Sequence, residues 1–154
     1  METKKQTAPL NILLADDDKD DCLLFKEALR EVKVEKKLVT VEHGVALMDF
    51  LNQTDALPEI IFLDINMPHK NGKECLAEIR NHKLFSDIPV VMYSTSNNKA
   101  DIEETYNGGA NFYLVKPFLF TGLTDVLEKL PSWDWSKQKP HSPKEQFVIN
   151  AEEQ

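Results

Sequence analysis

The chain has 154 residues, with 26 Asp and Glu against 18 Lys and Arg, so its formal net charge is −8. This length is typical of one domain, and 42% hydrophobic with 29% charged residues is typical of a soluble globular protein. The acidic balance argues against nucleic acid as a partner, because phosphate binding draws on clustered Lys and Arg. No apolar run approaches the roughly 18–20 residues that span a bilayer, and no signal peptide is evident, so we expect a cytoplasmic protein without membrane insertion.

Short apolar runs alternate five times with helix-length amphipathic segments. In chain order the runs are Ile12–Ala15, Leu38–Val41, Ile60–Leu63, Pro89–Tyr93 and Phe112–Val115. Each run is followed by a segment with helical spacing, the fourth being the most polar, and these segments are Cys22–Leu29, Val45–Leu51, Cys75–Arg80, Lys99–Tyr106 and Leu123–Leu130. Asp18 is placed to cap the first helix, Gly108-Gly109 to close the fourth, and Pro131 to stop the last.

The composition of the apolar runs indicates the fold class. Runs that are apolar throughout, rather than alternating, are typical of strands buried on both faces by helices. Five successive strand–helix units therefore predict a doubly wound α/β fold, with a five-stranded parallel sheet flanked by five helices.

Polar residues follow the apolar runs where parallel strands end. In such a sheet, ligands bind at the carboxyl ends of the strands, so these residues are expected to converge: Asp16, Asp17, Asp64, Ser94, Thr95 and Lys116. Carboxylates at close range suit a hard cation such as Mg²⁺, while an ammonium and a hydroxyl suit phosphoryl oxygens. Asp64 stands alone after the third run, so it is the candidate nucleophile that forms an aspartyl phosphate.

These residues, in this order, resemble the receiver domain of two-component response regulators. The resemblance covers about residues 10–130 and rests on Asp16-Asp17, on Asp64 with Met67-Pro68 and Gly72 behind it, on Ser94-Thr95 and on Lys116-Pro117-Phe118. The chain is most similar to the single-domain type of the chemotaxis regulators. The resemblance implies a flavodoxin-like receiver fold with the strand order 2-1-3-4-5.

The resemblance also implies a role for each site residue. Asp64 is the expected phosphoacceptor for a histidine kinase or a histidine phosphotransfer protein, and Lys116 contacts the phosphoryl group. The expected Mg²⁺ ligands are Asp16, Asp17, Asp64 and the backbone carbonyl of Asn66. The expected switch hydroxyl is that of Ser94, with Thr95 as the alternative one position away. Tyr113 is either the switch aromatic or a core residue. Asn66 and Ser96 are expected to tune the rate of dephosphorylation.

The remaining segments bear on output. We expect a flexible N-terminal segment over residues 1–9, a receiver over 10–130, and a tail over 131–154 whose start packs on the domain. The tail is too short for a DNA-binding domain, so output is expected from the face Lys99–Leu130, toward a downstream protein or a second copy of the chain. On this face we expect exposed apolar side chains at Phe112, Phe118, Leu119 and Phe120. Cys22 and Cys75 match no metal spacing, which predicts a reduced pair.

Other functional classes fit the sequence less well. A phosphatase of the haloacid-dehalogenase type needs a second Asp two residues after its nucleophile, where this chain has Asn66, which cannot exchange a proton. A flavin carrier needs a phosphate-binding loop after the first strand, where Asp16, Asp17 and Asp18 repel phosphate. A receiver that has lost phosphorylation would not keep the full residue set. The sequence thus favours a signalling protein that catalyses only its own phosphorylation and dephosphorylation.

Overall fold

A parallel β-sheet forms the centre of the protein. The computed structural model describes residues 10–33, 35–130 and 144–150. Within these residues the sheet has six strands in the order β2-β1-β3-β4-β5-β6, all parallel. Their bounds are β1 (Leu10–Ala15), β2 (Lys36–Val41), β3 (Ile60–Leu63), β4 (Val90–Ser94), β5 (Phe112–Val115) and β6 (Val148–Asn150).

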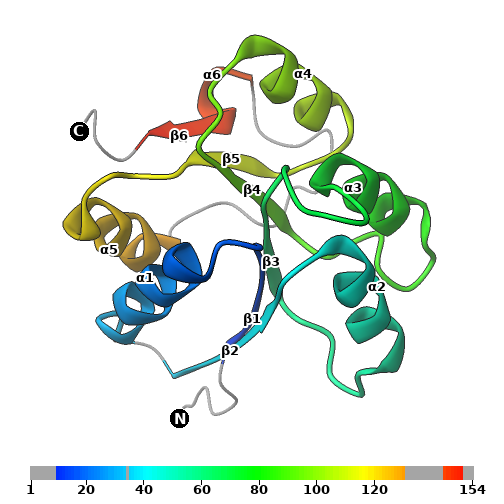
Figure 1. Ribbon diagram of the computed structural model, residues 1–154, viewed down its shortest axis with the longest axis horizontal. Helices are drawn as coiled ribbons and strands as arrows, with labels where there is room; N and C mark the ends of the chain where they lie inside the picture. Colours follow the sequence, from blue (N-terminus) through cyan, green and yellow to red (C-terminus); the bar gives the residue numbers. More distant parts are fainter. Residues whose placement is uncertain (1–9, 34, 131–143, 151–154) are drawn as a thin grey trace, which may run out of the picture.

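Helices cover both faces of the sheet (Figure 1). On one face lie α1 (Lys19–Arg30) and α5 (Phe120–Glu128), and on the other lie α2 (Gly44–Gln53), α3 (Gly72–Asn81) and α4 (Lys99–Asn107). The short α6 (Lys144–Phe147) precedes β6 beside α4. The predicted doubly wound fold with the order 2-1-3-4-5 is therefore confirmed for the first five strands. None of the helices in the described part of the chain is both long and apolar enough to cross a bilayer.

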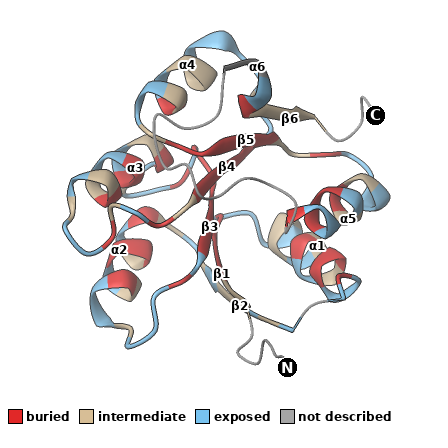
Figure 2. Ribbon diagram, turned by 180° about the vertical axis from the view of Figure 1, so that it is seen from behind, coloured by how far each residue is buried: buried red, intermediate tan, exposed pale blue. Residues whose placement is uncertain are grey.

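Burial explains why the central strands are apolar throughout. In β3 and β4 every residue is buried, whereas the edge strands β2 and β6 are mostly half-buried (Figure 2). Alternate residues of each central strand enter different cores, as Leu13 packs toward α2 and α3 while Ile12 packs toward α1 and α5. Burial on both faces removes the usual polar alternation. Both cysteines are free, as the sequence predicted.

The predicted helix ends agree with the structure in most details. Asp18 caps α1, because its carboxylate accepts a hydrogen bond from the Asp21 N–H at 3.1 Å. After α4, the left-handed residue is Gly109, with φ of 100°, while Gly108 keeps a right-handed conformation. Both glycines of the predicted stop signal are thus used, but only the second requires a positive φ.

The sheet has one strand more than the sequence predicted. Val148–Asn150 pairs with β5 in parallel, and α6 leads into it, so residues 144–150 are not a simple tail. A three-residue run carries too little periodicity to be identified as a strand from sequence. A second difference concerns Phe112, which was expected on the surface and is only 8% exposed, because it begins β5 and packs in the α1/α5 core. The predictions for residues 1–9 and for the start of the tail lie outside the described residues.

Candidate functional site

The carboxyl ends of β1, β3 and β5 bring three charged side chains together. The Asp64 N–H donates to the carbonyl of Ala15 at 2.9 Å, which holds Asp64 beside the end of β1. The Lys116 N–H likewise donates to the carbonyl of Ser94 at 2.9 Å. Parallel pairing therefore continues one residue past the strands, and it fixes where the site residues begin.

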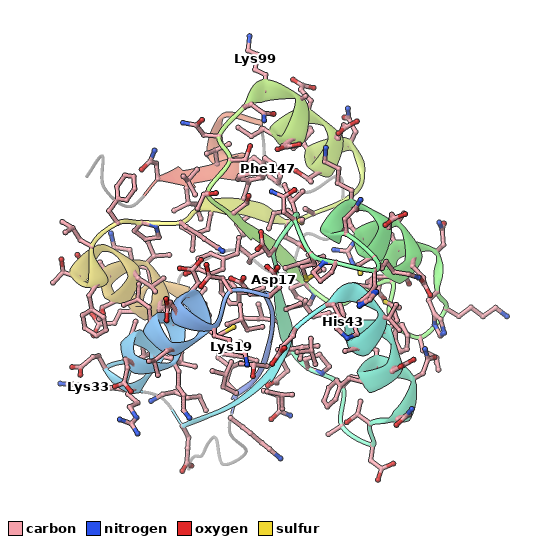
Figure 3. All side chains as sticks on the ribbon, in the orientation of Figure 1. Asp17, Lys19, Lys33, His43, Lys99 and Phe147 are labelled. Atoms are coloured by element: carbon pink, nitrogen blue, oxygen red, sulfur yellow. The ribbon has the colours of Figure 1, made fainter. Side chains whose placement is uncertain are left out.

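Three carboxylates form an acidic cluster at this edge. Asp16 is fully buried, Asp64 is 6% exposed, and Asp17 is exposed toward solvent near the centre of the view in Figure 3. One carboxylate oxygen from each of them lies within 4.8 Å of the other two. The predicted convergence of Asp16, Asp17 and Asp64 is thus seen in the structure.

Lys116 neutralises part of this charge. Its Nζ lies 2.8 Å from Asp16 Oδ2, 2.8 Å from Asp21 Oδ2 and 3.4 Å from Asp64 Oδ2, and its side chain is 9% exposed. Asp21 is a site residue that the sequence analysis did not single out. The only signal for it in the sequence was its place in the acid-rich stretch from Asp16 to Asp21. Because Asp21 lies in the first turn of α1, its carboxylate reaches Lys116.

The pKa values of Asp64 and Lys116 are both raised in the folded protein, but for different reasons. Burial, followed by the charge and hydrogen bonding of Asp16, raises the pKa of Asp64 from 3.8 to about 7, against the opposing effects of Lys116 and the Asn66 backbone N–H. Burial alone would lower the pKa of Lys116, but its contacts with Asp16 and Asp21 and the charge on Asp64 outweigh burial and raise it. Without a further cation, the site therefore disfavours full ionisation of Asp64.

The donor set fits a divalent metal ion. Asp16 Oδ2 is fully buried and, within the described residues, has no hydrogen bond of acceptable geometry, although Lys116 lies close to it. A buried carboxylate oxygen without a satisfied hydrogen bond calls for a further partner, such as a metal ion. Together with the two neighbouring carboxylates, it offers the all-oxygen environment that Mg²⁺ or Mn²⁺ prefers.

Two of the predicted switch residues, Ser94 and Tyr113, are connected by hydrogen bonds through Ser96. Ser94 is fully buried and its Oγ accepts from the Ser96 N–H at 3.1 Å, whereas Thr95 is exposed. The Tyr113 hydroxyl donates to the Ser96 carbonyl at 2.8 Å. Ser96 Oγ in turn donates to Asp101 Oδ2 in α4 at 2.7 Å. Burial raises the pKa of Tyr113, so this hydroxyl remains a donor at neutral pH.

Comparison with known proteins decides the family. The sequence model of the response regulator receiver domain matches residues 12–128. The chain belongs to the response regulator receiver family. This places it among the signalling proteins of two-component systems, rather than among phosphatases of the haloacid-dehalogenase type or flavin carriers.

Several receivers resemble this one along most of its length. Response regulator Rcp1 of Synechocystis sp. is 38% identical over 130 residues, which cover 81% of this chain and 88% of Rcp1. The crystal structure of the phosphorylated cyanobacterial phytochrome response regulator RcpA is 35% identical, with a TM-score of 0.75 over 81% of this chain and 93% of RcpA. The crystal structure of the Mn(2+)-bound form of Rcp1 is 35% identical, with a TM-score of 0.73 over 81% and 94% of the two chains.

Gly72 supports the backbone of the acidic site in this receiver. A Cβ at this position would lie 2.1 Å from the carbonyl oxygen of Asp64, and the Gly72 N–H donates to the carbonyl of Ile65 at 2.7 Å. We expect Gly72→Ala to reduce the free energy of unfolding by about 2–3 kcal/mol, because the Asp64 backbone must move to admit the methyl group. Urea denaturation measures this loss. Gly122→Ala, inside α5, is the matched control and is expected to stabilise by about 0.5–1 kcal/mol; equal effects of the two substitutions would contradict the close approach at Gly72.

Proposed function

We propose that Asp64 accepts a phosphoryl group in a Mg²⁺-dependent reaction, and that the protein signals through the resulting change of conformation. The observation that carries this proposal is the buried contact of the Asp64 carboxylate with Asp16 and Lys116 at the end of β3. The phosphorylated RcpA structure and the Mn(2+)-bound Rcp1 structure support it by similarity. The proposed donor is a histidine kinase or a histidine phosphotransfer protein.

The residues that would hold Mg²⁺ are Asp16, Asp17, Asp64 and the backbone carbonyl of Asn66. When bound, the ion neutralises carboxylate charge and the charge on the transferred group. In the transfer itself, one Asp64 oxygen attacks phosphorus and forms the new O–P bond. The N–P bond of the phosphohistidine breaks, and its electron pair returns to the imidazole nitrogen. This chemistry needs positioning and charge stabilisation more than covalent assistance.

Lys116 has the position to stabilise the product. Its Nζ lies 3.4 Å from Asp64 Oδ2, so a short movement brings it to a phosphoryl oxygen on the same side chain. Ser94 is the proposed switch hydroxyl rather than Thr95, because Ser94 is buried beside the site and Thr95 is exposed. Asn66 is exposed next to Asp64, where it can influence the approach of the water that hydrolyses the aspartyl phosphate, and Ser96 is proposed to act with it.

Output is proposed to come from the face Lys99–Leu130. Phe118, Leu119 and Phe120 are 92%, 62% and 38% exposed, and they follow Lys116 and Pro117 directly along the chain. Exposed apolar side chains in sequence are typical of a protein-binding surface. A downstream protein or a second copy of this chain is the proposed partner. Phosphorylation is proposed to shift the population between two conformations of the receiver, one of which binds this partner more tightly.

A labelling experiment tests the proposed function. With acetyl phosphate and Mg²⁺, intact-mass measurement is expected to show the gain of one phosphoryl group, which hydroxylamine removes, and Asp64→Asn is expected to abolish the gain. Asp20→Asn is the matched control, because Asp20 is an exposed acid in the first turn of α1, and it is expected to label like the wild type. Retention of a labile label in Asp64→Asn would place the nucleophile elsewhere. No label in the wild type would favour a scaffold.

A further inference from the structure

The C-terminal segment Lys144–Asn150 occupies the edge of the sheet next to the proposed switch. In β6, Val148 pairs with Tyr113, Ile149 with Leu114 and Asn150 with Val115. Phe147, the last residue of α6, has no exposed surface. In Figure 1, α6 and β6 lie beside α4 and β5, so this segment covers part of the face from which output is proposed.

Phe147 anchors the segment by contacting aromatic rings from two other elements. Its ring centroid lies 5.1 Å from that of Tyr106 in α4, at an interplanar angle of 76°, and 6.2 Å from that of Tyr113 in β5, at 60°. Figure 3 shows Phe147 at the start of β6, on the side of the sheet that carries α4. Edge-to-face and tilted ring pairs at such distances are favourable beyond the area they bury. Phe147 therefore stabilises Tyr113 in its buried position.

Tyr113 connects this segment to the phosphorylation site. Its buried ring belongs to the same core as Phe147, and its hydroxyl donates to the Ser96 carbonyl at 2.8 Å. The next hydrogen bond runs from the Ser96 N–H to Ser94 Oγ at 3.1 Å. Only Ser96 thus separates the Tyr113 hydroxyl from the proposed switch hydroxyl of Ser94.

We propose that Phe147–Asn150 is an intramolecular clamp, which holds Tyr113 in its buried position and so favours phosphorylation of Asp64. The proposal rests on the proposed function of Asp64. When the Ser94 hydroxyl moves to a phosphoryl group, it gives up its hydrogen bond with the Ser96 N–H, and the bond from the buried Tyr113 hydroxyl to the Ser96 carbonyl then helps to hold the loop. The clamp and the phosphoryl group then favour the same conformation, and two ligands that favour one conformation strengthen each other.

The direction of the coupling follows from linkage. If the clamp favours phosphorylation, a phosphoryl group must tighten the clamp by the same factor. The strand β6 also takes up the hydrogen-bonding edge of β5. A partner that binds the face Lys99–Leu130 therefore also contacts β6 at the edge of the sheet. After phosphorylation, the β6 that it contacts is better ordered.

The affinity for a phosphoryl analogue measures this coupling. With beryllium trifluoride in saturating Mg²⁺, calorimetry on the full chain is expected to show a Kd at least about fivefold weaker for Phe147→Ala than for the wild type, the lower end of typical coupling between linked sites. Hydrogen exchange at the amides of 148–150 is expected to be slower in the wild type with Mg²⁺ and beryllium trifluoride than with Mg²⁺ alone. The Kd for Mg²⁺ alone is expected to stay unchanged in Phe147→Ala.

Ile149→Ala is the matched control. Ile149 lies in the same strand but packs on the opposite face of the sheet, in the core with α1 and α5, so the Phe147 ring stays on Tyr113. Its Kd for the analogue is expected within about twofold of the wild type, below the coupling threshold. If Phe147→Ala does not fold, Phe147→Leu keeps apolar volume without the ring and is expected to weaken the analogue in the same direction.

The outcomes separate the clamp from the function on which it rests. Equal Kd values for the analogue in the wild type and in Phe147→Ala or Phe147→Leu would overturn the clamp and leave the phosphoacceptor role intact. Equal weakening by Ile149→Ala and Phe147→Ala would also overturn it, because the effect would then come from general loosening of the sheet edge. A wild type that neither binds the analogue nor takes up label would overturn the proposed function itself.

Discussion

Lys116→Ala is expected to lower the free energy of unfolding by about 3–5 kcal/mol in EDTA at neutral pH, the usual effect of removing one partner from a buried ion pair. Lys116 is the cation that lies against Asp16, Asp21 and Asp64, and the side chains of Asp16 and Asp64 are 0% and 8% exposed. Its loss leaves buried carboxylates without a counter-charge. Urea denaturation, with the slope compared between variants, measures the change.

Lys73→Ala is the matched control for Lys116→Ala. Lys73 in α3 also contacts two carboxylates, Asp101 at 2.6 Å and Glu104, but its side chain is 32% exposed. Exposed ion pairs contribute about 0–1 kcal/mol, so the expected loss is small. Saturating Mg²⁺ is expected to recover part of the stability of Lys116→Ala, because a second cation then faces the same carboxylates. Similar losses from the two lysines, or no recovery with Mg²⁺, would contradict the buried ion-pair cluster.

The first five strands and the helices between them could be predicted because buried strands and surface helices have different patterns of apolar residues. Ile60–Leu63 and Val90–Ser94 are buried on both faces, so their residues show no polar alternation. The amphipathic segments between the strands bury one side only. The order of the strands, in contrast, came from resemblance to a family, since periodicity carries no information about which strands are neighbours.

Long-range contacts set the limits of the prediction. Val148–Asn150 is a strand only because β5 offers it a partner distant in sequence, and three residues do not reveal that pairing. In the sequence, Asp21 is one of several acidic residues at the start of a helix. Only the geometry of α1 brings its carboxylate to Lys116. Asp16, Asp64 and Lys116 could be predicted because they follow directly after strands whose ends meet at one edge.

Ser94 and Tyr113 illustrate two questions that the sequence left open. Neighbouring hydroxyls at 94 and 95 look alike in sequence, but only Ser94 is buried and bonded within the site loop. Tyr113 is a core residue and also carries a hydrogen bond to the same loop. The two readings of Tyr113 are therefore compatible, because a switch aromatic must itself be packed in order to respond to movement around it.

Asp64→Asn is expected to stabilise the metal-free protein, and the gain is expected to grow with pH. Burial raises the pKa of Asp64 from 3.8 to about 7, so the folded protein holds this proton more tightly than the unfolded chain does. The wild type therefore has the full stabilising effect of protonation below about pH 4 and loses it as the pH rises through about 7. Asn resembles the protonated side chain at every pH.

Urea denaturation in EDTA is expected to show nearly equal stability of wild type and Asp64→Asn at pH 4, and an advantage of about 2–4 kcal/mol for Asp64→Asn at pH 8. Asp17→Asn is the matched control, because Asp17 belongs to the same cluster but is exposed, and a change within about 0.5 kcal/mol is expected. Saturating Mg²⁺ is expected to stabilise the wild type more than Asp64→Asn, since the substitution removes a charged ligand. A pH-independent difference in stability between wild type and Asp64→Asn would mean that burial does not raise the pKa of Asp64, and that Lys116 compensates the carboxylate charge in full.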